Sequence, residues 1–270
     1  MSVLAWIIVF SLIGGVLSVV SAGIFLLFPK KFRIQLLPHL VSFAIGALLG
    51  AAFLDLLPEA LEGAAHLDPH AITATVLFGV LGFFLLEKIV LWRHCHSHPT
   101  PLDVSDPVHA TATVHGHSHS RAEAAGTLIV IGDSIHNFVD GVLIAAAFMT
   151  DIRLGIVTSL AVAAHEIPQE VGDFAILLHS GFSRRKALFF NILSSFTTVV
   201  GGVLAYYSLA GLERVLPFVL AIAASSFIYI AVADLIPDLH QRAQGRATIH
   251  QFMLIALGVL VIYLTQSALH

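Results

Sequence analysis

Eight apolar segments, each long enough to cross a bilayer as a helix, divide this chain of 270 residues. The hydrocarbon core of a bilayer offers no hydrogen-bond partner to backbone N–H and C=O groups. Each such segment must therefore satisfy them internally, as an α-helix does. The chain is 57% hydrophobic and only 11% charged, and its mean hydropathy of +0.92 lies outside the range of soluble domains. We therefore predict one all-α integral membrane domain over residues 1–270, with helices near residues 3–28, 38–61, 70–92, 124–148, 153–179, 186–208, 214–236 and 249–268.

The basic residues orient this arrangement in the membrane. Only Arg153 and Arg214 fall on one side. The other side carries the remaining eleven basic residues: Lys30, Lys31, Arg33, Lys88, Arg93, Arg121, Arg184, Arg185, Lys186, Arg242 and Arg246. Because the richer side is normally cytoplasmic, we expect both termini outside. The basic cluster follows the first apolar run, so we interpret that run as a retained span rather than a signal peptide.

Net charge and cysteine content limit which partners and covalent links the chain can have. The net charge of -4 gives no indication of a nucleic-acid partner, and Cys95 is the only cysteine, so no disulfide forms within one chain. The chain is compact and has no long extracellular domain, which favours a bacterial inner (plasma) membrane. We expect the lipid bilayer to be one of its partners.

Metal-binding side chains interrupt the fourth and fifth segments. At 3.6 residues per turn, one stripe on the fourth segment carries Asp133, His136, Asn137 and Asp140, and one on the fifth carries His165, Glu166, Gln169, Glu170 and Asp173. Two stripes on consecutive antiparallel helices should face each other. Their imidazole, carboxylate and amide groups suit Zn²⁺, Fe²⁺ or Mn²⁺. Pro168 lies in the second stripe, and we expect it to kink the helix beside a cavity.

Purely structural roles are the alternative to metal binding for these polar residues. A lone intramembrane His is often a hydrogen-bonded core residue, and a lone Asp can pair with Lys or Arg. Residues 124–148 and 154–178 contain no Lys or Arg, so acids at this density need a bound cation or protons. Asp133 and Asp173 stay open between supporting a ligand and structural hydrogen bonding.

An intramembrane metalloprotease is the enzyme alternative. The run His165-Glu166-Ile167-Pro168-Gln169 lacks the second His of the His-Glu-x-x-His zinc motif, and its proline lies where that motif needs regular helix. We therefore expect a protein that is not an enzyme.

A His-rich segment separates the third and fourth spans. Residues 93–121 have low apolar content, contain Pro99, Pro101 and Pro107, and carry seven histidines: His94, His96, His98, His109, His115, His117 and His119. We predict a mobile cytoplasmic loop that binds metal weakly, although its composition alone is also compatible with a plain linker.

A short repeat links the second and seventh spans. Asp55-Leu56-Leu57-Pro58 in one resembles Asp234-Leu235-Ile236-Pro237 in the other, and the predicted topology runs the two spans in opposite directions. We interpret spans 1–3 and 6–8 as inverted repeats around spans 4 and 5, a common construction in transporters. The alternative is that Asp-x-x-Pro merely ends a helix at the interface.

These motifs resemble those of the ZIP (Zrt-, Irt-like protein) family of divalent metal transporters, in particular its LIV-1-like branch. The matching runs are Gly132-Asp133-Ser134-Ile135-His136-Asn137-Phe138-Val139-Asp140-Gly141 and His165-Glu166-Ile167-Pro168-Gln169-Glu170-Val171-Gly172-Asp173. The resemblance implies an eight-helix bundle with external termini, a His-rich cytoplasmic loop, import of divalent metal and a homodimer.

The resemblance also implies a ligand set. By position, His136, Asp140, His165 and Gln169 would form the main transport site, Asn137 and Glu166 would help to build an adjacent one, and Asp55 would lie near the metal's route. The chain departs from the branch at Gln169, where His is usual, so affinity or selectivity is open there. Some bacterial relatives also place a Glu on the sixth span, but Ser194-Ser195-Phe196-Thr197-Thr198 has none, and a binuclear site stays open.

We expect a transporter of divalent cations, with Zn²⁺ favoured and Fe²⁺, Mn²⁺, Co²⁺ or Cd²⁺ as further substrates. Import into the cytoplasm through a site on spans 4 and 5 is the favoured function. The alternatives are a metal exporter and a membrane metal sensor that moves no ion.

Overall fold

The computed structural model describes residues 1–64, 69–95, 114–241 and 247–269, and these ranges contain helices and no strand. The elements in chain order are α1 (Val3–Leu27), α2 (Lys30–Gly50), η1 (Ala51–Leu56), α3 (Leu57–Gly63), α4 (Pro69–Cys95), α5 (Val114–Thr150), α6 (Ile152–His179), α7 (Arg184–Leu209), η2 (Glu213–Val215), α8 (Leu216–Tyr229), η3 (Ile230–Leu235), α9 (Ile236–Gln241) and α10 (Ala247–Leu269).

Helical structure covers all eight predicted spans. Six helical stretches in the described ranges are long and apolar enough to cross a bilayer by length and composition alone. The third predicted span contains the shorter apolar stretch His70–Leu86 within α4. The fifth is α6, where Glu166, Glu170 and Asp173 reduce the apolar character. The prediction of an all-α membrane protein with eight helices is therefore confirmed.

The predicted loop over residues 93–121 is too long. Helix α4 continues to Cys95 and α5 begins at Val114, while residues 96–113 lie outside the described ranges. Low apolar content argues against a span but not against a helix that extends into water. All three prolines of the segment precede residue 114, so none of them interrupts the first turns of α5.

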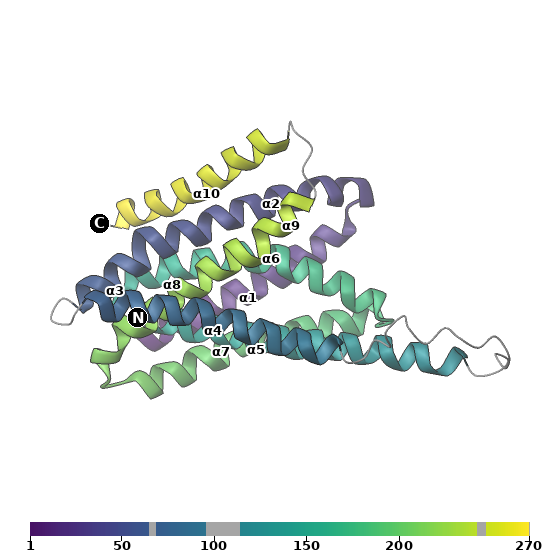
Figure 1. Cartoon of the computed structure of the whole chain (residues 1–270), viewed down its shortest axis with the longest axis horizontal. Helices are drawn as coiled ribbons and strands as arrows, with labels where there is room; N and C mark the ends of the chain where they lie inside the picture. Colours follow the sequence, from purple (N-terminus) through teal and green to yellow (C-terminus); the bar gives the residue numbers. More distant parts are fainter. Residues whose placement is uncertain (65–68, 96–113, 242–246, 270) are drawn as a thin grey trace.

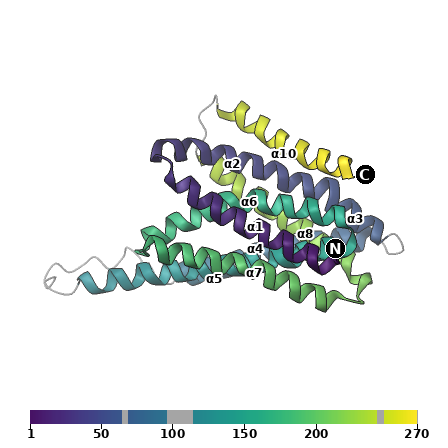
Figure 2. The same cartoon turned by 180° about the vertical axis from the view of Figure 1, so that it is seen from behind.

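The helices form a bundle with α6 in its interior and α5 beside it (Figure 1). Helix α5 packs against α6 and α7, α1 packs against both α6 and α7, and α2 packs against α6. The outer helices are α10, which packs mainly on α2, and α4, which packs on α8. Figure 2 shows the same arrangement from behind, with the N- and C-termini at the same end of the bundle.

Small residues allow this close packing. A Cβ added at Gly141 of α5 would collide with the carbonyl of Thr198 on α7, and one added at Gly201 of α7 would collide with the carbonyl of Phe138 on α5. The two backbones therefore touch where glycine removes the side chain, a common basis of helix association in lipid.

Two π-helical segments distort the bundle at matching sequence positions. Both η1 and η3 carry an Asp at their fifth residue, and a proline, Pro58 or Pro237, follows two residues after the segment ends. Proline has no N–H, so Pro58 cannot bond to the carbonyl of Leu54 one turn earlier; the side chain of Gln266 on α10 donates to that carbonyl instead, at 3.1 Å.

The paired distortions bear on the predicted inverted repeat. Figures 1 and 2 both show α2 and α8, which lead into η1 and η3, running in opposite directions. The shared local geometry and opposite direction favour the repeat over a chance Asp-x-x-Pro match, and the repeat itself stays a prediction.

Candidate metal site

The reversal between α5 and α6 fixes how their polar stripes face each other. Asp151 is the one residue between the two helices, and its carboxylate caps α6 by accepting the N–H groups of Arg153 at 2.7 Å and Leu154 at 3.4 Å. An Asp at this position satisfies two of the free N–H groups at the start of a helix. The two helices therefore run antiparallel in direct contact, as the sequence predicts.

Four side chains from these helices meet near the middle of α6. One potential ligand atom from each of His136, Asp140, His165 and Glu166 lies within 4.8 Å of the other three. We call this group the four-residue cluster. Asp140, His165 and Glu166 are buried, whereas 24% of the His136 side chain is exposed, so the cluster is enclosed except at one imidazole.

The spacing within the four-residue cluster suits one small dication. The Nε2 atom of His165 lies 3.2 Å from Nε2 of His136 and 3.3 Å from Oδ2 of Asp140. The Nε2 atom of His136 lies 3.6 Å from Oε1 of Glu166 and 3.7 Å from Oδ2 of Asp140. A tetrahedral Zn²⁺ with bonds of about 2.0–2.1 Å separates its ligand atoms by about 3.4 Å. The Nε2 atom of His165 lies 3.9 Å from Oε1 of Glu166, and all four ligand atoms lie within 4.8 Å of one another. The Glu166 carboxylate must therefore move closer to the other ligands for tetrahedral binding.

The tautomer of His165 also favours a metal. Its Nδ1 lies 3.2 Å from the carbonyl oxygen of Ala161, one turn earlier on α6. Since a carbonyl can only accept, Nδ1 carries the proton and Nε2 directs its lone pair into the cluster. A hydrogen bond of this kind orients most metal-binding histidines and raises their basicity.

The carboxylates of the cluster lack the partners that buried acids need. Both oxygens of Asp140 and both of Glu166 are buried without a hydrogen-bond donor, and residues 124–148 and 154–178 contain no Lys or Arg. Burying an unpaired carboxylate in the apolar region of a membrane costs about 3 kcal/mol or more. A bound dication, or protons, would remove that cost.

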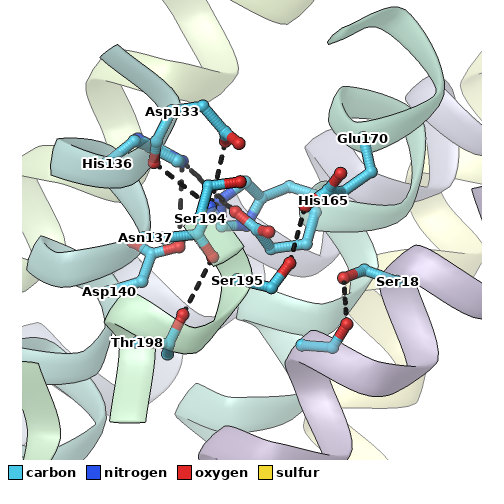
Figure 3. A network of polar contacts seen from close by, with 12 residues as sticks. Ser18, Asp133, His136, Asn137, Asp140, His165, Glu170, Ser194, Ser195 and Thr198 are labelled. Carbon is cyan, nitrogen blue, oxygen red and sulfur yellow. Dashed lines mark hydrogen bonds and ion pairs between the residues drawn. The ribbon is translucent and has the colours of Figure 1, made fainter. Parts of the chain in front are cut away.

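Asn137 belongs to a neighbouring hydrogen-bond network (Figure 3). Its Nδ2 donates to Oδ1 of Asp133 at 3.0 Å, and its Oδ1 accepts from the hydroxyl of Thr198 on α7 at 2.8 Å. The side chain of Gln169 also contacts the Asp133 carboxylate. The structure thus groups Glu166 with the two histidines and Asp140, while Asn137 and Gln169 interact with Asp133.

Glu170 is buried deeper along α6. The hydroxyl of Ser195 on α7 donates to its Oε1 at 2.8 Å, whereas its Oε2 has no hydrogen-bond partner. Sequence reasoning missed the roles of Thr198 and Ser195, because it examined their segment only for a missing Glu. The available signal was the density of hydroxyls, Ser194, Ser195, Thr197 and Thr198, within an apolar helix.

Asp55 lies away from the four-residue cluster, in η1. It is buried, its Oδ2 has no hydrogen-bond partner, and it lines a cavity of about 370 Å³. Glu59, Glu62, Asp151 and Arg153 also line this cavity. The cavity is therefore acidic, at the end of the bundle where α5 meets α6.

Comparison with known proteins identifies the family of the chain. A family model described as ZIP Zinc transporter matches residues 2–266. The chain is 33% identical to mouse zinc transporter ZIP13 and 30% identical to human ZIP13, with 84% of this chain aligned to 69% and 70% of those proteins. It is 30% identical to metal cation symporter ZIP14 of Xenopus tropicalis, over 90% of this chain and 64% of that protein. The chain is thus a multi-pass membrane protein that belongs to the ZIP zinc transporter family.

Proposed function

We propose that this chain imports divalent metal ions, Zn²⁺ above all, into the cytoplasm through the four-residue cluster. The observation that carries the proposal is the set of two imidazole nitrogens and two carboxylate oxygens within 4.8 Å of one another, with buried acid oxygens that lack donors. Borderline N/O ligands favour Zn²⁺, and they also accept Fe²⁺, Mn²⁺, Co²⁺ and Cd²⁺.

The proposed path begins at the acidic cavity. Asp55, Glu59 and Asp151 line it, and clustered carboxylates raise the local concentration of cations. Basic residues are fewer at this end, so by the positive-inside rule we infer that it is external. An ion attracted there exchanges water for the ligands of the four-residue cluster and then leaves toward the cytoplasmic end.

Orientation, compartment and assembly belong to the same proposal. We infer external termini from the positive-inside rule, a bacterial inner membrane from the compactness of the chain, and a homodimer from the family resemblance. The relatives named above are animal proteins, so the bacterial compartment rests on the sequence interpretation alone.

The test is transport by the purified full-length protein in liposomes that contain a metal-sensitive dye. External Zn²⁺ should raise the internal signal, and His136→Ala and Asp140→Ala should each lower the rate at least about tenfold, the effect of losing about 1.4 kcal/mol of ligand interaction. Glu213→Gln, on an exposed residue of η2, is the matched control and should keep the full rate.

The same assay distinguishes the alternatives. Signal loss from preloaded vesicles without uptake would indicate an exporter, and binding without flux in either direction would indicate a sensor. Full flux in both variants would reject the four-residue cluster as the transport site.

A further inference from the structure

Three further carboxylates continue beyond the four-residue cluster toward the C-terminal end of α6. On α6, Glu170 and Asp173 follow Glu166 by one and two turns, about 6 and 10 Å along the axis. On the antiparallel α5, Asp133 precedes His136 by one turn. Because the two helices are antiparallel, earlier residues of α5 and later residues of α6 lie toward the same end of the bundle. All three acids therefore lie on one side of the four-residue cluster.

The burial and contacts of these acids differ from those of a solvated acidic face. Glu170 is fully buried, and Asp133 is 7% exposed. Figure 3 shows the two on facing helices, with the Glu170 carboxylate directed toward the α5 side. The carboxylate of Asp133 is close enough to those of Glu170 and Asp173 to interact electrostatically.

The second oxygen of Glu170 points independently to a missing ligand. Ser195 donates to Oε1, which fixes the carboxylate, while Oε2 is buried without any donor. The Asp133 carboxylate is held by the side chains of Asn137, Ser194 and Gln169. Both carboxylates thus have fixed orientations, and residues 124–148 and 154–178 contain no Lys or Arg to neutralise them. A cation would supply the partner that Oε2 of Glu170 lacks.

We propose that Asp133, Glu170 and Asp173 form a second cation site, made of oxygen ligands only, that receives each metal ion from the four-residue cluster during its release. The proposal rests on the transport function given above. An all-carboxylate site binds Zn²⁺ less tightly than a site with imidazoles and accepts Mn²⁺ more readily. A weaker site next to a tighter one allows conduction, because an ion that binds must also leave.

Asp173 links this second site to the surface. It is half-buried, and its carboxylate interacts electrostatically with that of Asp234 in η3, whose side chain is exposed. The basic residues Arg184, Arg185 and Lys186 follow the end of α6, so by the positive-inside rule this end is cytoplasmic. The second site therefore lies on the exit side of the four-residue cluster.

The test counts bound metal on the full-length protein in detergent. After dialysis against Zn²⁺, Glu170→Gln and Asp173→Asn should each hold about one ion per chain fewer than the wild type, because each removes a ligand charge with little change of shape. Metal on the His-rich residues 93–121 is common to all these proteins and cancels in the difference. Glu213→Gln should hold as much metal as the wild type. Asp140→Asn should lose the other ion and still bind Mn²⁺, detected by electron paramagnetic resonance.

Transport then tests the role in release. In liposomes, Glu170→Gln and Asp173→Asn should lower the maximal uptake rate about tenfold with little change in the half-saturating Zn²⁺ concentration, since capture occurs elsewhere. Asp173 is half-buried, so Asp173→Asn provides the test if Glu170→Gln fails to fold.

The results separate the two proposals. Equal Zn²⁺ contents of Glu170→Gln, Asp173→Asn and the wild type, together with full uptake by Asp173→Asn, would refute the second site and leave the transport function standing. A wild type with no flux would refute the transport function, while the metal count would still decide whether the second site exists.

Discussion

Replacement of Asp140 by Asn tests the metal-binding geometry most directly. The amide has nearly the shape of the carboxylate, so the substitution leaves no cavity and removes one charge. Asp140 is 1% exposed, and its Oδ2 lies 3.3 Å and 3.7 Å from the two histidine nitrogens. Neither of its oxygens has a hydrogen-bond donor, so nothing other than the cluster should require the charge.

The expected loss of metal affinity follows from the number of ligands. Structural Zn²⁺ sites bind with about 12 kcal/mol, or about 3 kcal/mol for each of four ligands. Loss of about 3 kcal/mol weakens Kd about 150-fold. At a Zn²⁺ concentration about 100 times the wild-type Kd, metal stabilises the wild type by about 2.7 kcal/mol and the variant by only about 0.3 kcal/mol.

Thermal unfolding in detergent, with chelator and with Zn²⁺, measures this difference. Zn²⁺ should raise the Tm of the wild type clearly and that of Asp140→Asn very little. In chelator the variant should be at least as stable as the wild type, because the amide replaces a buried carboxylate that accepts no hydrogen bond. Glu213→Gln removes the same charge at an exposed position and should behave as the wild type in both conditions.

Two results would refute the reasoning. An unchanged Zn²⁺ shift in Asp140→Asn would mean that the carboxylate does not bind the metal. Marked destabilisation in chelator would mean that a protein partner, rather than an ion, compensates its charge.

Three further predictions concern packing, hydrogen bonding and proton competition. Gly201→Ala should lower the free energy of unfolding by about 1–3 kcal/mol, because the new Cβ meets the carbonyl of Phe138. Gly172→Ala is the control, because a Cβ there has no atom within 4 Å. Equal Tm values for the two variants would contradict the close approach of α5 and α7. Thr198→Val should cost about 1 kcal/mol in thermal unfolding, because Asn137 loses its 2.8 Å donor; no change would mean that this bond contributes nothing. Zn²⁺ uptake should fall reversibly as the external pH is lowered, because protons compete for the same imidazoles and carboxylates; uptake independent of pH would argue against a His and carboxylate site.

The sequence alone determined the helical membrane architecture. Long apolar segments must satisfy their backbone hydrogen bonds internally in lipid, so they form helices. The helical period then places His136 and Asp140 on one stripe and His165 and Glu166 on another. Both properties are local, because they depend on residues within a few turns of one another. The sequence also shows where the apolar pattern ends, near residue 93. It does not show that α5 begins at Val114, because polar residues form a helix as readily as a loop.

Tertiary structure alone decided which atoms meet. Glu166 joins the two histidines while Gln169 turns to Asp133, a choice set by the rotation of α6 against α5 and by the hydroxyls of α7. The Leu54 carbonyl, which Pro58 cannot bond, accepts from the side chain of Gln266, 212 residues later in the chain. Such contacts depend on the relative placement of whole helices, and that placement follows from the packing of glycine surfaces across the bundle.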